Sequence, residues 1–145
     1  MYKRILIAVE HSEADRTILD HIQPLARMCG ASLLVVHVAD GWAARAYHDL
    51  NLRESAEILE DRAYLARVQD ELAAAGFAVT SQLAMGEPAT ELVRIAESEG
   101  VDLVAMATHG HGFLKDIFLG ETVDRVRHAL KVPVLLLQAK RPDSL

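Results

Sequence analysis

The stretch RILIAV, residues Arg4–Val9, is one of five apolar runs of strand length in this chain. The others are SLLVVHV at Ser32–Val38, AVTSQLA at Ala78–Ala84, DLVAMA at Asp102–Ala107 and VPVLLLQ at Val132–Gln138. Three of the five are nearly continuous in valine, isoleucine, leucine and alanine, which is typical of strands buried on both faces, as in a parallel sheet. The third run alternates more, so we expect that strand at an edge of the sheet.

Amphipathic helical patterns separate these runs. Ser12 and Asp15 resemble a capping box at the start of the first helix, and Gly30 suits its end. The next two helices are expected to end near Gly76 and Gly100. The predicted buried faces are made of apolar side chains spaced mainly by three and four: Ile18, Ile22, Leu25 and Cys29; Leu52, Ala56, Leu59, Ala63 and Ala66; Ala89, Leu92, Val93 and Ala96; and Val123, Val126 and Leu130.

The order of these elements is βαβαβαβαβ, which with right-handed crossovers predicts an α/β fold with a doubly wound parallel sheet. A length of 145 residues suits one domain, 1–145, and a hydrophobic content of 51% can build its core. The least regular stretch, residues 39–51, is expected to form a loop in which Trp42 and Tyr47 cover either a ligand or a neighbouring helix.

The charge and the single cysteine exclude several classes of partner. A net charge of −6 argues against nucleic-acid or anionic-membrane binding, which require a basic face. No segment approaches the roughly 20 apolar residues of a membrane helix, and the N-terminal residues lack the pattern of a signal peptide. Cys29 is the only cysteine, so no intrachain disulfide forms, and we expect a cytoplasmic protein.

A ligand site is expected beyond the carboxyl ends of the strands, where strand order reverses. If the first and fourth strands are neighbours there, AVEHS (Ala8–Ser12) meets ATHGHG (Ala107–Gly112). Gly110 allows the backbone to approach a ligand closely, and Gly120 opens the helix that follows, where free amides and the helix dipole favour an anion. The alternative is that these glycines only turn the chain.

Three segments closely resemble the universal stress protein family: ILIAVEHSEAD at 5–15, GEPATELVRIAESEGVDLVAMATHGHG at 86–112 and LGETVDRVRHALKVPVLLL at 119–137. The resemblance covers nearly the whole chain. It implies a five-stranded parallel sheet in the order 3-2-1-4-5 with helices on both faces. It also implies a homodimer paired through the last strand, Val132–Gln138.

Many members of that family bind ATP through a pattern of Gly, two residues, Gly, nine residues, Gly, then Ser or Thr. Gly110 and Gly120 match this pattern, with nine residues between them. Ala107 replaces the first glycine, and Glu121 stands where a hydroxyl would bond phosphate. The next hydroxyl, Thr122, is one residue late.

The resemblance implies an adenine nucleotide, AMP or ATP, as the ligand. Glu10 replaces the family's usual aspartate, and it would hold the ribose or a Mg²⁺ ion. Val38 would meet the base through its backbone. The residues that the resemblance places around the nucleotide are Ala8, Val9, Glu10, Val38, Met106, Ala107, His109, Gly110, Gly120, Glu121 and Thr122.

Glu121 has two interpretations. As a carboxylate in the first turn of a helix, it is favoured by the free amides and the dipole, occupies the anion site and repels a triphosphate, so AMP would bind better than ATP. Alternatively it points into solvent and only complements the dipole. If Glu121 and Ala107 have closed the pocket, the chain is a nucleotide-independent dimeric adaptor.

Metal binding and catalysis are further alternatives. His109 and His111, with Glu10 and His11, are residue types that bind Zn²⁺, but their spacing has no fixed geometry. The motifs of a nucleophile elbow and of a Walker loop are absent, which leaves a slow ATPase as the most catalysis we expect. The sequence therefore favours a dimeric regulatory protein that binds an adenine nucleotide and acts through a protein partner, which the sequence does not identify.

Overall fold

The computed structural model describes residues 1–39, 56–108 and 120–139. Its five strands form one parallel sheet in the order β3-β2-β1-β4-β5. The strands are β1 Arg4–Ala8, β2 Ser32–Ala39, β3 Val79–Met85, β4 Leu103–Thr108 and β5 Val134–Gln138. This confirms the predicted sheet and its strand order, and it confirms the third strand at an edge.

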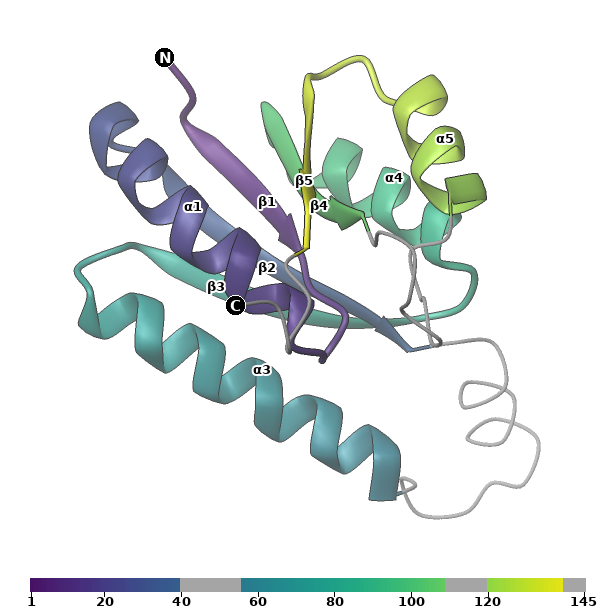
Figure 1. The fold of residues 1–145 in the computed structure, drawn as a ribbon, viewed down its shortest axis with the longest axis horizontal. Coiled ribbons are helices and arrows are strands. Elements are labelled where there is room, and N and C mark those ends of the chain that lie inside the picture. The colour runs from purple at the N-terminus through teal and green to yellow at the C-terminus, as the bar shows by residue number, and fades with distance from the viewer. Residues whose placement is uncertain (40–55, 109–119, 140–145) are drawn as a thin grey trace.

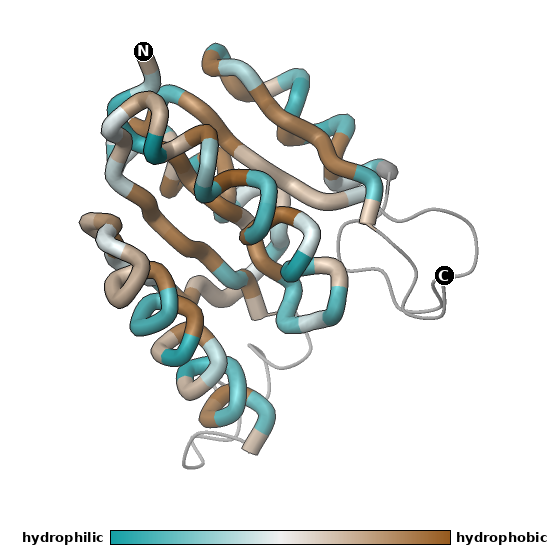
Figure 2. Tube along the Cα trace, turned by 60° about the vertical axis from the view of Figure 1, so that its left-hand side comes forward, coloured by the Kyte–Doolittle hydropathy of each residue, from teal (hydrophilic) through white to brown (hydrophobic). Residues whose placement is uncertain are grey.

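Helices cover both faces of the sheet (Figure 1). Helices α1 and α3 lie on one face, and α4 and α5 lie on the other. Their bounds are α1 Ala14–Cys29, α3 Ala56–Ala74, α4 Pro88–Ser98 and α5 Gly120–Ala129. Figure 2 shows strands that are apolar along most of their length, between helices that alternate polar and apolar residues.

The central strand β1 is paired on both sides. Ile5 lies opposite Leu33 of β2 and Leu103 of β4. Because successive side chains of a strand point to opposite faces, Ile5 joins the core beneath α1 and α3, whereas Leu6 joins the core beneath α4 and α5. Both side chains are completely buried, which explains why the run reads as continuously apolar.

Local signals set the ends of two helices. Gly30 ends α1 in the left-handed region, with φ of 66°, and its N–H bonds to the carbonyls of Ala26 and Arg27. Glu87 caps α4, since its carboxylate accepts hydrogen bonds from the backbone N–H groups of Ala89 and Thr90 at 3.3 and 2.7 Å. Each of these residues satisfies backbone groups that a helix leaves open at its ends.

Only half of the capping box predicted at the start of α1 forms. The Asp15 carboxylate accepts the backbone N–H of Ser12 at 3.2 Å, as the box requires. The Ser12 hydroxyl instead accepts the N–H of Ala14 at 3.3 Å and donates to Glu10 at 3.1 Å. Ser12 thus links the helix to the carboxyl end of β1.

The prediction of which face of α3 is buried is wrong. Ala56, Leu59, Ala63 and Ala66 are exposed, Leu59 by 53%, and Leu52 lies outside the described residues. The face that contacts the sheet consists of Ile58, Asp61, Leu65, Val68 and Leu72. This stripe has the same three-and-four spacing, but the acidic Asp61 interrupts its apolar pattern. The alanines form an uninterrupted stripe, but their small side chains would bury less apolar surface than Ile58, Leu65, Val68 and Leu72 do.

Candidate functional site

The carboxyl end of β1 is organised by one buried carboxylate. Asp15, in the first turn of α1, accepts the backbone N–H groups of Glu10, His11 and Ser12 at 2.8, 2.9 and 3.2 Å. The chain bends around it, and His11 takes φ of 63°, a left-handed conformation that is uncommon for a residue with a side chain. These bonds hold Glu10 and His11 in fixed positions at the end of the strand.

A tyrosine of α3 completes this arrangement. The Tyr64 hydroxyl donates a hydrogen bond to Asp15 at 2.5 Å, and its ring stacks on the His11 imidazole with 4.2 Å between ring centres. Burial, together with the charge of Asp15, raises the pKa of the Tyr64 phenol. The phenol therefore stays protonated, so that it remains a donor to the carboxylate.

Two histidines meet at Asp61, which α3 turns toward the sheet. His11 donates from Nδ1 to the Asp61 carboxylate at 2.7 Å, and Nε2 of His37, on β2, lies 3.4 Å from its other oxygen. Nδ1 of His37 is 2.9 Å from the carbonyl of Val9. Because a carbonyl only accepts, Nδ1 carries a proton. The contacts of Nδ1 with Val9 and of Nε2 with Asp61 fix the orientation of the His37 ring.

These groups border a pocket of about 320 Å³ at the carboxyl ends of β1 and β2, which we call the carboxyl-edge pocket. Its lining residues are Glu10, His11, His37, Val38, Ala39, Glu57, Glu60 and Asp61. Glu10 is only 3% exposed, and the Ser12 hydroxyl donates to its carboxylate at 3.1 Å. Four of the eight lining residues are acidic, so this pocket suits hydroxyl and amino groups that donate hydrogen bonds and disfavours phosphate.

Each helix within the described residues also carries an acid in its first turn. These acids are Asp15 in α1, Glu57 in α3, Glu91 in α4 and Glu121 in α5. A carboxylate there offsets the positive end of the helix dipole, which is the same feature that would otherwise attract a phosphate. An anionic ligand at this edge therefore competes with charges that the chain already supplies.

The residues predicted to hold a nucleotide occupy three environments. Glu10 and Val38 line the carboxyl-edge pocket. Ala8, Val9, Met106 and Ala107 are completely buried at or beside the ends of β1 and β4. Helix α5 begins at Gly120, with Glu121 exposed and Thr122 partly buried. His109 and Gly110 lie outside the described residues, as do His111, Trp42 and Tyr47.

Sequence reasoning missed His37, Asp61 and Tyr64, which position the groups of this site, and Glu57 and Glu60, which also line its pocket. One signal was available for His37, since it is the only polar residue between Leu33 and Val38 and therefore interrupts a buried strand. Asp61 and Tyr64 reach the site only because α3 turns one face to the end of β1, which no local pattern indicated.

Two further findings concern metals and membranes. In the part of the chain that the structure describes, no group of three or more histidine, cysteine, aspartate or glutamate side chains is arranged to hold a metal ion. Within residues 1–39, 56–108 and 120–139, no helix combines the length and the apolar character that a bilayer span requires.

The chain belongs to the universal stress protein family, whose sequence profile matches residues 1–138. Universal stress protein MJ0577 of Methanocaldococcus jannaschii is 29% identical in an alignment 157 residues long, gaps included, that covers 97% of each chain. The solved structure of MJ0577 superposes with a TM-score of 0.80 and 30% identity, and the match covers 97% of this chain and 99% of that one.

Two other solved structures of the family contain adenine nucleotides. A universal stress protein in complex with cAMP has a TM-score of 0.68 and 20% identity, covering 96% of this chain and 98% of that one. The universal stress protein from Archaeoglobus fulgidus in complex with dAMP has a TM-score of 0.68 and 20% identity, covering 93% and 97%. At this identity, the two likenesses concern the fold.

Proposed function

We propose that this chain binds an adenine nucleotide at the carboxyl edge of its sheet and acts as a regulatory protein in the response to stress. The carboxyl-edge pocket carries the proposal, because it places the buried carboxylate of Glu10 beside the ends of β1 and β2. A carboxylate there accepts hydrogen bonds from the ribose hydroxyls. The complexes of two family members with cAMP and dAMP support the same class of ligand.

AMP is the nucleotide that this site suits better than ATP. Glu121 lies in the first turn of α5 and is exposed, and three further acids, Glu57, Glu60 and Asp61, line the neighbouring pocket. Like charges about 4 Å apart repel by roughly 1 kcal/mol in water and by several times that when partly buried. Each added phosphate therefore increases the repulsion, and Mg²⁺ bound with the phosphates would reduce it.

The proposal includes a homodimer, an unidentified protein partner and a cytoplasmic location. Strand β5 lies at the edge of the sheet, and the Leu136 side chain is 38% exposed on it, which supports pairing through this strand. The single cysteine, Cys29, suits a reducing compartment.

The first experiment is mass spectrometry of small molecules released from the purified, denatured protein. AMP, ADP or ATP near one equivalent per chain is the expected result. No nucleotide, together with no thermal shift in millimolar AMP or ATP, overturns the proposal in favour of a nucleotide-independent dimeric adaptor. Multiple turnover of ATP would instead show an enzyme, and zinc retained after purification without an affinity tag would show a metal site.

The second experiment compares affinities for AMP, ADP and ATP by calorimetry. Glu121→Ser removes the carboxylate at the start of α5 and should tighten ATP binding about tenfold while changing AMP binding less. Glu97→Ser serves as the matched control, because it removes an exposed carboxylate near the carboxyl end of α4, away from the start of α5. An unchanged ATP affinity in Glu121→Ser would show that this carboxylate does not face the phosphates.

A further inference from the structure

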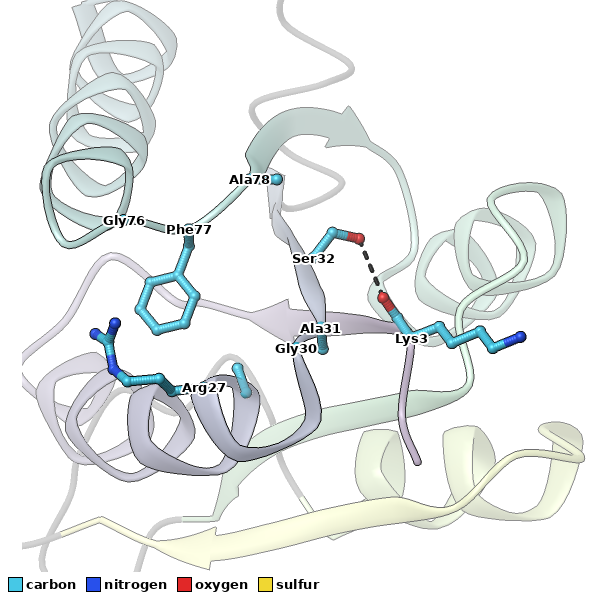
Figure 3. A pocket seen from close by; sticks show the side chains of 9 residues that line it. Lys3, Arg27, Gly30, Ala31, Ser32, Gly76, Phe77 and Ala78 are labelled. Atoms are coloured by element: carbon cyan, nitrogen blue, oxygen red, sulfur yellow. Dashed lines mark hydrogen bonds between the residues drawn. The ribbon is translucent and has the colours of Figure 1, made fainter.

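A second pocket lies at the opposite edge of the sheet, where β1, β2 and β3 begin, and we call it the amino-edge pocket (Figure 3). Its volume is about 450 Å³. It lies where α1 and α3 end, and its lining residues are Lys3, Ala26, Arg27, Gly30, Ala31, Ser32, Gly76, Phe77 and Ala78. Since the strands are parallel, this pocket and the carboxyl-edge pocket are separated by the length of the sheet.

The charge of the amino-edge pocket is opposite to that of the chain. Among the residues that the structure describes, Lys3 and Arg27 are its charged lining residues and none of its lining residues is acidic, although the chain carries a net charge of −6. The carboxyl ends of α1 and α3 each contribute roughly half a negative charge here. The Asp102 carboxylate, which accepts the backbone N–H of Lys3 at 2.8 Å, offsets part of the Lys3 charge, so Arg27 supplies the main attraction for an anion.

Two contacts orient the Arg27 side chain at the amino-edge pocket. Its guanidinium carbon lies 4.6 Å from the centre of the Phe77 ring, and Nη2 donates to the carbonyl of Ala75 at 3.2 Å. A guanidinium carries five N–H donors in a rigid plane and is well shaped to bind a carboxylate or phosphate through two of them. Arg27 is exposed, but these two contacts favour one orientation of its guanidinium, which reduces the side-chain entropy lost on binding.

The opposite wall is equally fixed in its backbone. The N–H of Lys3 donates to the Asp102 carboxylate at 2.8 Å, and the carbonyl of Lys3 accepts both the N–H and the hydroxyl of Ser32, at 2.9 and 3.3 Å. Figure 3 shows the Lys3 side chain extending away on the other side of Ser32 from the Arg27–Phe77 pair. Lys3 therefore contributes an exposed charge at the rim and extends away from Arg27 and Phe77.

Apolar surface and open space complete the pocket. Ala26, Ala31 and Ala78 provide small apolar walls beside the Phe77 ring. Gly30 leaves the mouth open, since a Cβ built there would meet no atom within 4 Å. The volume lies in the range of pockets that bind small molecules, about 300–1,000 Å³.

We propose that the amino-edge pocket binds a small organic anion in which a carboxylate or phosphate group is joined to a compact apolar body. Arg27 pairs with the anionic group, Lys3 adds attraction from the rim, and the ring of Phe77 with the alanine walls contacts the apolar body. This site is independent of the nucleotide site proposed above and remains a valid proposal if that site fails.

Titration of ¹⁵N-labelled protein with four ring compounds tests the proposal. Benzoate and phenyl phosphate are the anionic probes, benzamide is the neutral control, and benzamidine is the cationic control. Both anions should shift the amide resonances of Ser32, Phe77 and Ala78 to saturation, and benzamide should bind at least about tenfold more weakly. Shifts confined to the carboxyl edge, no saturation at millimolar probe, or equal binding of benzamide overturns the proposal.

Variants separate a ligand role from a structural one. Arg27→Gln should weaken benzoate binding about tenfold, and Lys3→Gln should weaken it about threefold. Lys3→Gln should leave the fold intact, because the hydrogen bonds described above for Lys3 are made by its backbone. Arg94→Gln, which removes an exposed charge paired with Glu91, is the matched control and should bind benzoate normally. Unchanged benzoate affinity in both Arg27→Gln and Lys3→Gln would overturn the proposal and show that Arg27 has only a structural role, through its contacts with Ala75 and Phe77.

Discussion

Replacing Asp15 with alanine should destabilise the protein more than any surface change. Its carboxylate is 1% exposed and accepts four hydrogen bonds, from the backbone of Glu10, His11 and Ser12 and from the Tyr64 hydroxyl. Hydrogen bonds to charged groups contribute about 1.5–3 kcal/mol each, and they are not additive. Water can reach some of the freed donors, because the groups around His11 and Ser12 are only partly buried. We therefore expect a loss of about 3–4 kcal/mol.

Urea unfolding followed by far-ultraviolet circular dichroism measures this loss as a lower midpoint at an unchanged slope. Asp20→Ala is the matched control on the same helix: Asp20 pairs with Arg16 at 3.0 Å, but both side chains are exposed, so the expected loss is below about 1 kcal/mol. A loss below about 1 kcal/mol in Asp15→Ala, at unchanged slope, would refute the view that one carboxylate organises the end of β1.

Three further predictions test the fold. The raised pKa of Tyr64 means that the free energy of unfolding should fall as pH rises above about 10, where the unfolded chain ionises first, and Tyr64→Phe should flatten that fall in urea titrations across this range. Gly30→Ala should lower the free energy of unfolding by about 1–2 kcal/mol in urea, because a residue with a Cβ is strained at φ of 66°. No atom lies within 4 Å of the new methyl group, so no steric clash adds to this loss, and an unchanged stability would contradict the left-handed cap. Leu72→Ala should lower stability by about 2–5 kcal/mol and Leu59→Ala by less than about 0.5, and the reverse order would contradict the observed orientation of α3.

The sheet could be predicted because its three central strands, β1, β2 and β4, are buried on both faces. Each of the five apolar runs coincides with a strand to within two residues at either end, and the more alternating run at 78–84 is indeed an edge strand. The orientation of α3 could not be predicted by the same logic. Its buried stripe includes Asp61, whose partners His11 and His37 are distant in the sequence. The exposed alanines form the more regular apolar pattern, so local spacing favours the wrong face.

The site was predictable only in part, for a related reason. Glu10 follows a buried strand directly, so its place at the carboxyl edge could be inferred from topology, and the structure places it in a pocket. Tyr64 contributes through its contacts with Asp15 and His11, which depend on how α3 lies across the sheet. Tertiary packing therefore decided which polar side chains meet.

The double pairing of β1 also affects how the chain folds as it is made. One side of this strand pairs with β2 early in synthesis, but its other side pairs with β4, and the bond from Arg4 to Asp102 spans 98 residues. At roughly 5–20 residues per second, a ribosome takes about 5–20 s to produce that interval. Throughout this time the nascent chain presents an apolar strand with one unpaired edge, a surface that attracts other strands and that chaperones shield.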